Sequence, residues 1–117
     1  MKITFFWIDD DGGREPSCRS DILSREGVDM LACLLTDSGG QRQKSTLNWI
    51  DEGISRVDLV CGEEVDISEW SRDSWGVELK KGVAKIYSLY DETCFSIMPI
   101  EEFKKALLSW REFVYKG

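Results

Sequence analysis

Carboxylates and tryptophans are the residues most able to form a functional site in this sequence, and one segment concentrates both. It reads Asp66-Ile-Ser-Glu69-Trp70-Ser-Arg-Asp73-Ser-Trp75. A core segment would be more uniformly apolar, and aromatic rings among carboxylates are typical of an interface for a cationic partner. We therefore interpret Asp66, Glu69, Trp70, Asp73 and Trp75 as candidate partner-binding residues. The alternative is that both tryptophans are core residues whose polar neighbours face solvent.

Further carboxylates gather where the sequence predicts turns. Asp51-Glu52, Glu63-Glu64 and Asp91-Glu92 are acidic pairs, and Asp9-Asp10-Asp11 precedes two glycines. Exposed turns are commonly charged, so a purely solvated role is the simplest explanation of any single pair. The same groups could face a basic partner, and we add Asp9, Asp10, Asp11, Asp91 and Glu92 to the candidate partner-binding residues.

The sequence offers little for catalysis or for a cofactor. Asp9 and Asp11 have the spacing of calcium ligands, but the twelfth position counted from Asp9 is Ser20, where the calcium loop requires a glutamate. Histidine is absent, which removes the commonest general base and zinc ligand. No glycine-rich phosphate loop occurs. We expect no enzyme and no cofactor or metal.

The four cysteines, Cys18, Cys33, Cys61 and Cys94, are scattered without a Cys-x-x-Cys spacing. In a reducing compartment such cysteines are usually small buried hydrophobes, and we expect that role here in place of disulfides or metal ligation.

Composition limits the class of partner. The chain has 117 residues, 42% of them hydrophobic, and a net charge of −7 that is spread over both halves. Such a surface repels nucleic acid and anionic membranes and favours a basic protein. No apolar run reaches the roughly 18–20 residues of a membrane span, and the first residues lack the pattern of a signal peptide. We expect one domain, residues 1–117, in the cytoplasm.

The last third of the chain has the clearest structural pattern. Residues 83–90 alternate with apolar residues on both faces, which predicts a central strand, and Asp91-Glu92-Thr93 predicts a hairpin turn into a second strand over Cys94–Met98. Beyond Pro99 the period changes to that of an amphipathic helix. Its apolar stripe consists of Ile100, Phe103, Leu107, Trp110 and Val114.

The first two-thirds of the chain predict further strands and helices. We expect a strand over Lys2–Ile8 that joins the sheet, a loop with helical pieces over 14–27, and a buried helix over Val28–Leu35, capped by Ser24 or Asp29. Residues 46–53 fit either a strand or a short helix, and 55–61 predict a strand. A further strand begins at Trp75 and turns at Lys80–Gly82. The class is therefore α+β: a single antiparallel sheet with helices packed on one face, ending in strand, strand and helix.

The C-terminal third resembles a known family. Ile86-Tyr-Ser-Leu-Tyr-Asp-Glu-Thr93, followed by Phe95-Ser-Ile-Met-Pro-Ile-Glu-Glu-Phe-Lys-Lys-Ala-Leu-Leu-Ser-Trp-Arg-Glu-Phe113, is similar to the ending of small bacterial immunity proteins. These are cytoplasmic antidotes of contact-dependent growth inhibition and related polymorphic toxin systems. The resemblance covers about 30 residues and implies a protein that binds one toxin domain, often a basic nuclease, and blocks its active site or substrate path. The family has no shared catalytic residues to assign.

Composition and resemblance lead to the same expectation. We expect an immunity protein that neutralises the C-terminal domain of a cognate toxin, without binding nucleic acid or membrane directly. The alternative is a small non-catalytic adaptor or regulatory domain that associates with itself. The oligomeric state stays open at this point.

Overall fold

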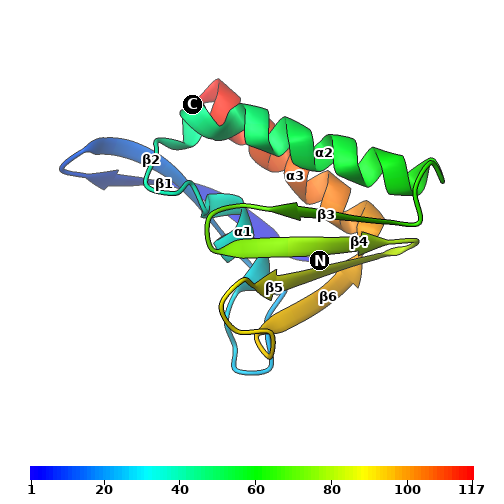
Figure 1. The fold of residues 1–117 in the computed structure, drawn as a ribbon. Helices are drawn as coiled ribbons and strands as arrows, with labels where there is room; N and C mark the ends of the chain where they lie inside the picture. Colours follow the sequence, from blue (N-terminus) through cyan, green and yellow to red (C-terminus); the bar gives the residue numbers. More distant parts are fainter.

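A four-stranded antiparallel sheet and three α-helices form most of the molecule, with a two-stranded ribbon beside them (Figure 1). The computed structural model describes residues 1–117, apart from the side chain of Asp10. The elements are β1 (Ile3–Asp10), β2 (Gly13–Ser20), α1 (Met30–Thr36), the 3₁₀ helix η1 (Gln43–Thr46), α2 (Leu47–Cys61), β3 (Ile67–Ser71), β4 (Trp75–Lys80), β5 (Val83–Ser88), β6 (Phe95–Pro99) and α3 (Ile100–Lys116).

The sheet follows chain order, β3-β4-β5-β6, and the predicted meander and α+β class are confirmed. Val77 and Leu79 of β4 and Ala84 and Ile86 of β5 are fully buried, and apart from Gly76 they alternate with exposed or half-buried residues. One face of the sheet therefore belongs to the core and the other meets solvent. The two hairpin turns that join β3 to β4 and β5 to β6 lie at the same end of the sheet (Figure 1).

The predicted C-terminal helix is α3, and all five residues of its expected stripe are buried. Pro99 precedes it as the N-cap residue, and Glu101 and Glu102 occupy its first turn, where negative charge suits the helix dipole. Trp110 and Phe103 are the largest side chains that are fully buried. Strand, turn, strand and helix therefore follow one another as expected.

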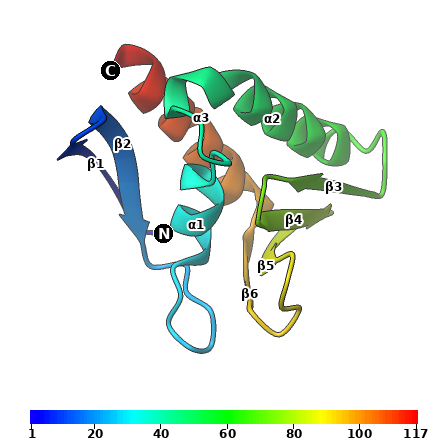
Figure 2. The ribbon, with the colours of Figure 1, turned by 60° about the vertical axis from the view of Figure 1, so that its left-hand side comes forward.

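The apolar helix near residue 30 is α1, and it is capped by Asp29, whose carboxylate accepts a hydrogen bond from the Ala32 N–H at 3.0 Å. Four of its seven residues are buried, which confirms that it lies deep in the fold. Figure 2 shows α1 between the β1–β2 ribbon and the four-stranded sheet.

The N-terminal strand was expected to join the sheet, and residues 14–27 were expected to form a loop. The first prediction is wrong, and the second is wrong for residues 14–20 but right for 21–27: β1 pairs along its length with β2 in a separate two-stranded ribbon, joined by a two-residue turn at Asp11-Gly12. The polar composition of β2 hides it, but Pro16 and Cys18 alternate as its buried residues. Aromatic contacts hold the ribbon on α3, with Phe5 5.3 Å from Phe113 between ring centroids.

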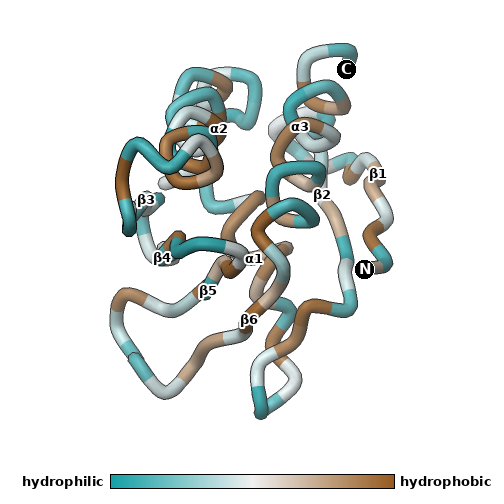
Figure 3. Tube along the Cα trace, turned by 90° about the vertical axis from the view of Figure 1, so that its right-hand side faces the viewer, coloured by the Kyte–Doolittle hydropathy of each residue, from teal (hydrophilic) through white to brown (hydrophobic). Residues whose placement is uncertain are grey.

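The strand expected at 55–61 is also wrong, because these residues form the second half of the 15-residue helix α2, which also settles residues 47–53 as helix. The β-branched residues favoured a strand, yet Ile50, Gly53, Val57 and Val60 recur at three- and four-residue steps and are the buried ones. Asp51-Glu52 accordingly lies within a helix and not in a turn. In Figure 3 hydrophobic and hydrophilic residues alternate as α2 and α3 wind side by side.

Candidate partner-binding surface

The acidic, tryptophan-containing segment forms β3 and the turn that follows it, directly beside α2. An open cleft of about 470 Å³ runs between these elements. From the predicted set, Glu69, Trp70 and Asp73 line it. The other lining residues are Trp49, Glu52, Arg56, Ser71 and Arg72. The structure therefore brings three of the five predicted residues of this segment into one concave surface. We call it the α2–β3 cleft.

The α2 wall of the cleft is formed by one helical ion pair. Arg56 Nε lies 2.9 Å from Glu52 Oε1, one helical turn away, and both side chains are largely exposed. A second nitrogen of Arg56 donates to the backbone carbonyl of Glu69 on the outer edge of β3, at 3.4 Å. An exposed pair of this kind contributes about 0.3–0.5 kcal/mol. The wall is thus weakly held and can rearrange around a ligand.

Trp70 forms the base of the cleft and is only 6% exposed. Its ring lies on Gly53 of α2, where a Cβ atom would come within 2.9 Å of the indole. Gly53 therefore sets how closely α2 approaches β3. Trp70 is in this respect a core residue, as the alternative interpretation held, and it can offer a partner only its rim.

Arg72 lies beside this base and is 7% exposed. Its guanidinium lies over the rings of Trp49 and Trp70, at 5.7 and 5.6 Å from their centroids. Two nitrogens donate to the Leu35 carbonyl and the Thr46 hydroxyl at 3.4 Å, and Nε has no partner among the described residues. Burial lowers the pKa of Arg72 to about 10, although nearby Asp37 acts in the opposite direction. A cation of the chain itself thus already lies over both indole rings.

The rim of the cleft is negatively charged. Glu69 and Asp73 are exposed, and neither forms an ion pair within the described part of the chain. Asp73 accepts only a long hydrogen bond from the Ser74 hydroxyl, at 3.4 Å. Glu69 lies opposite Glu78 of β4, and like charges in that position repel. Lys80 pairs with Glu78 at 3.3 Å, so Glu69 is the carboxylate of the two that has no ion pair in the described chain and could bind an added cation.

Two residues of the segment lie outside the cleft. Asp66 precedes β3 and borders a separate hollow that contains Glu63 and Lys81. Trp75 is half-buried against the core, and its backbone N–H donates to the Asp37 carboxylate at 3.1 Å. Asp37 also accepts the Ser74 N–H at 2.7 Å, so it fixes the turn that presents Asp73.

The β5–β6 turn carries Asp91 and Glu92 at the same end of the sheet as Asp73. The Thr93 N–H and hydroxyl donate to Asp91 at 3.0 and 2.6 Å, and these hydrogen bonds lower the pKa of Asp91. Tyr90, next in sequence, is 81% exposed, the most exposed large hydrophobic residue of the described chain. The backbone N–H of Leu89 donates to the Ser74 carbonyl at 3.0 Å, which joins this turn to the β3–β4 turn.

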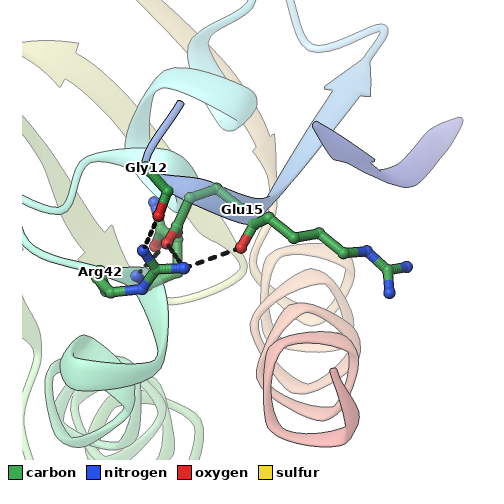
Figure 4. A network of polar contacts seen from close by, with 5 residues as sticks. Gly12, Glu15 and Arg42 are labelled. Atoms are coloured by element: carbon green, nitrogen blue, oxygen red, sulfur yellow. Dashed lines mark hydrogen bonds and ion pairs between the residues drawn. The ribbon is translucent and has the colours of Figure 1, made fainter. Parts of the chain in front are cut away.

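The third acidic group lies at the tip of the β1–β2 ribbon, where Asp9 and Asp11 are exposed and the side chain of Asp10 lies outside the described structure. Arg42 anchors this tip: its guanidinium donates to the carbonyls of Gly12 and Arg14 at 2.9 and 3.1 Å and pairs with Glu15 at 2.8 Å (Figure 4). This tip belongs to the β1–β2 sheet, whereas the α2–β3 cleft lies beside the four-stranded sheet.

Sequence reasoning missed the α2 side of the cleft, namely Trp49, Glu52 and Arg56, and it missed Tyr90. The prediction of a strand over 55–61 hid Arg56, while Trp49 and Glu52 lie in residues 46–53, which fitted either a strand or a short helix. The signal was present, since Glu52 and Arg56 have the four-residue spacing of a helical ion pair, and Trp49 lies three residues before Glu52. Nothing in the sequence distinguishes Tyr90 as exposed from Tyr87, which is half-buried.

The cysteines are all free, but they are not uniformly buried. Cys18 is buried, and its pKa is raised to about 12 by desolvation, then by Asp29 and Cys33. Cys33 and Cys94 are half-buried, and Cys61, which was expected to be buried, is exposed at the end of α2. Among the residues that the structure describes, no three His, Cys, Asp or Glu side chains are placed to hold a metal ion.

No helix in the described residues combines the length and apolar character needed to cross a membrane. Comparisons of the chain with models of known protein families, with curated proteins and with solved structures found no match.

Proposed function

We propose that this protein is an immunity protein that binds and neutralises a toxin domain, and that a basic group of the toxin enters the α2–β3 cleft. The observation that carries the proposal is the rim of that cleft, where Glu69 and Asp73 are exposed and without ion pairs next to Trp49 and Trp70. Exposed carboxylates bind guanidinium and ammonium groups by charge-assisted hydrogen bonds, whereas the rings of Trp49 and Trp70 already carry the Arg72 guanidinium.

The overall charge supports the same partner. A net charge of −7 accelerates encounter with a basic surface, and association of this kind slows as salt screens the charges. The acidic β5–β6 turn and Tyr90 lie at the same end of the sheet as Asp73, which extends the negative surface beyond the cleft. A toxin held there would have its active site or substrate path covered, as the resemblance to immunity proteins implies.

The genes that flank this one test the class of protein. A secreted protein with a C-terminal toxin domain encoded immediately upstream would support the proposal, and an operon of metabolic genes would oppose it. The toxin domain is then co-expressed with this chain, and growth is scored. Wild-type chain should restore growth, and failure to do so at equal expression would reject an immunity function.

A charge-reversal variant tests the surface. Glu69→Lys with Asp73→Lys should abolish protection while the protein stays folded, because neither carboxylate supports the fold through an ion pair. The matched control, Glu26→Lys with Glu64→Lys, makes the same change in net charge at two exposed positions away from the cleft. Protection that survives in the first variant would place the interface elsewhere.

The alternative function, an adaptor or regulatory domain that associates with itself, has one specific observation in its favour. The solvent face of the four-stranded sheet carries several exposed apolar side chains.

A further inference from the structure

Arg56 is a cation of the chain itself that already lies in the α2–β3 cleft. Figure 1 shows α2 running alongside β3, and Arg56 reaches from the helix to the strand. Its Nε donates to the Glu52 carboxylate at 2.9 Å, and a second guanidinium nitrogen donates to the Glu69 carbonyl at 3.4 Å. One guanidinium group thus joins an acceptor on α2 to an acceptor on β3.

Both acceptors are open to further donors. Strand β3 is an edge strand, so the carbonyl of Glu69 on its outer edge faces no neighbouring strand. The Glu52 side chain is 54% exposed, and an ionised carboxylate has about four positions that accept hydrogen bonds. A guanidinium bound by these two groups therefore remains accessible to exchange.

The cleft contains a second guanidinium, that of Arg72, which is held very differently. Arg72 is buried beneath the cleft with its charge over two indole rings, so it cannot leave without opening the core. Arg56 is largely exposed and is held by an ion pair within one helix, a type of contact that contributes little to stability. Arg72 is thus a fixed part of the cleft, and Arg56 is replaceable.

The charges that line the cleft also favour replacement of Arg56 by a cation from outside. Three carboxylates, those of Glu52, Glu69 and Asp73, lie with two guanidiniums, those of Arg56 and Arg72, so the lining carries a net charge of −1. When Arg56 turns out into solvent, three carboxylates and one guanidinium remain, with a net charge of −2. An incoming guanidinium restores the original balance.

We propose that an arginine of the partner displaces Arg56 and binds the Glu52 carboxylate and the Glu69 carbonyl in its place. This inference rests on the proposed function; it names arginine as the basic group that enters the cleft and Glu52 as a further binding residue. Arg56 makes the free chain partly self-inhibited. A lysine ammonium is a compact charge without the planar fork of donors that Arg56 presents, so arginine is the preferred ligand.

The first experiment compares Arg56→Gln with a matched control, Lys105→Gln. Lys105 is exposed on α3 and forms no ion pair in the described chain, so the two variants have the same net charge. Isothermal titration calorimetry gives the affinity of each for a hexa-arginine peptide. Arg56→Gln should bind at least about twofold more tightly than the control, the factor that corresponds to release of one exposed helical ion pair. Equal affinities overturn the inference.

Glu52→Gln separates displacement of Arg56 from a general effect of charge. In the Glu52→Gln background the acceptor that Arg56→Gln sets free is absent. The gain in affinity from Arg56→Gln should then fall to that of Lys105→Gln in the same background, as a double-mutant cycle measures. A gain that persists undiminished would mean that Arg56 does not compete for Glu52, and it overturns the inference.

Hexa-lysine, which has the same number of charges, tests the assignment of arginine. Wild-type chain should bind it several-fold more weakly than hexa-arginine. Equal affinities for the two peptides would contradict recognition of the guanidinium fork.

A further measurement needs no variant at Arg56 and covers the case in which Arg56→Gln fails to fold. The NMR resonance of the Arg56 Nε–H in the wild-type chain should move as hexa-arginine is added, because its hydrogen bond to Glu52 breaks. Peptide binding that leaves this resonance in place overturns the inference and leaves the cleft as a cation site. Absence of peptide binding to both wild type and Arg56→Gln rejects the cation site itself and the inference with it.

Discussion

The two long helices α2 and α3 lie side by side, yet they differ in what they bury. Six residues of α3 are buried, and all are apolar, with Trp110 and Phe103 at the centre. Four residues of α2 are buried, and one of them is Gly53, which receives the ring of Trp70. Ion pairs join the exposed flanks of the helices, from Lys104 to Asp58 at 2.6 Å and from Arg111 to Asp51.

This difference in burial assigns the two helices different roles: α3 stabilises the fold, and α2 forms one side of the candidate binding surface. Burial of the large apolar stripe of α3 contributes most per residue, so α3 holds the sheet and the β1–β2 ribbon together. The shallower contact of α2 leaves a cleft against β3, with carboxylates on its rim. Changes in α3 should therefore affect folding, and changes around the cleft should affect a partner.

The largest effect is expected in α3. Trp110 is fully buried, so Trp110→Ala should lower the free energy of unfolding by about 3–5 kcal/mol. A loss of that size is a large part of the stability of a small domain. Urea unfolding followed by circular dichroism measures it, with the exposed Leu108→Ala of the same helix as the control. A Trp110→Ala protein as stable as that control would show that the stripe does not hold the fold.

The second-largest effect is expected from charge reversal at the rim of the cleft, and it should lower binding affinity without lowering stability. Glu69→Lys with Asp73→Lys should weaken affinity for a basic partner by about 2–4 kcal/mol, through lost attraction and new repulsion. The melting temperature should stay close to wild type, since the lysine introduced on β3 would lie opposite Glu78 and replace a repulsion with an attraction. Isothermal titration calorimetry and thermal melts separate the two effects. A collapsed melting temperature would assign these carboxylates a structural role.

Gly53→Ala should perturb both the packing of α2 on β3 and the α2–β3 cleft. The added methyl group would meet the Trp70 ring at 2.9 Å, and overpacking of this kind costs about 1–3 kcal/mol. The neighbouring exposed position on α2, Ser55→Ala, is the matched control. The free energy of unfolding of Gly53→Ala should be lower than that of Ser55→Ala. Equal values would mean that α2 can move away from β3 at little cost.

The smallest effect is expected at the ion pairs between the helices. The pKa of Lys104 is raised by its hydrogen bond and charge interaction with Asp58, so the folded state favours the charged lysine. The pair therefore stabilises the fold below the usual pKa of lysine, 10.5, and this contribution disappears as pH rises through the higher folded pKa. Asp58→Asn should lower the melting temperature by at most a few degrees at neutral pH and by less at alkaline pH. A difference that does not change with pH would contradict this origin.

The sequence predicted the elements whose pattern and composition agree. The stripe of α3, the cap of α1 by Asp29 (one of two candidates, with Ser24) and the β5–β6 hairpin combine apolar periodicity with matching cap or turn residues. Prediction failed where the two disagree. In α2 the β-branched residues favoured a strand although the buried residues have helical spacing. Strand β2 is polar and forms by pairing with β1, which local composition does not encode.

The candidate site was only partly predictable for the same reason. Glu69, Trp70 and Asp73 are close in sequence, so their grouping was visible before the fold was known. Trp49, Glu52 and Arg56 reach the cleft from a helix whose second half was predicted as a strand. Burial of Trp70 follows from the absence of a side chain at Gly53, a contact between distant parts of the chain.

Binding of a cation in the α2–β3 cleft is the central claim, and an NMR titration with a hexa-arginine peptide tests it most directly. The indole N–H resonance of Trp49 and the backbone amides of Glu69 and Asp73 should shift saturably, while those of α3 stay in place. The shifts should vanish in the Glu69→Lys, Asp73→Lys protein and persist in the Glu26→Lys, Glu64→Lys control. Shifts confined to Asp9 and Asp11 at the ribbon tip or to the β5–β6 turn, with Trp49 unmoved, would contradict the claim.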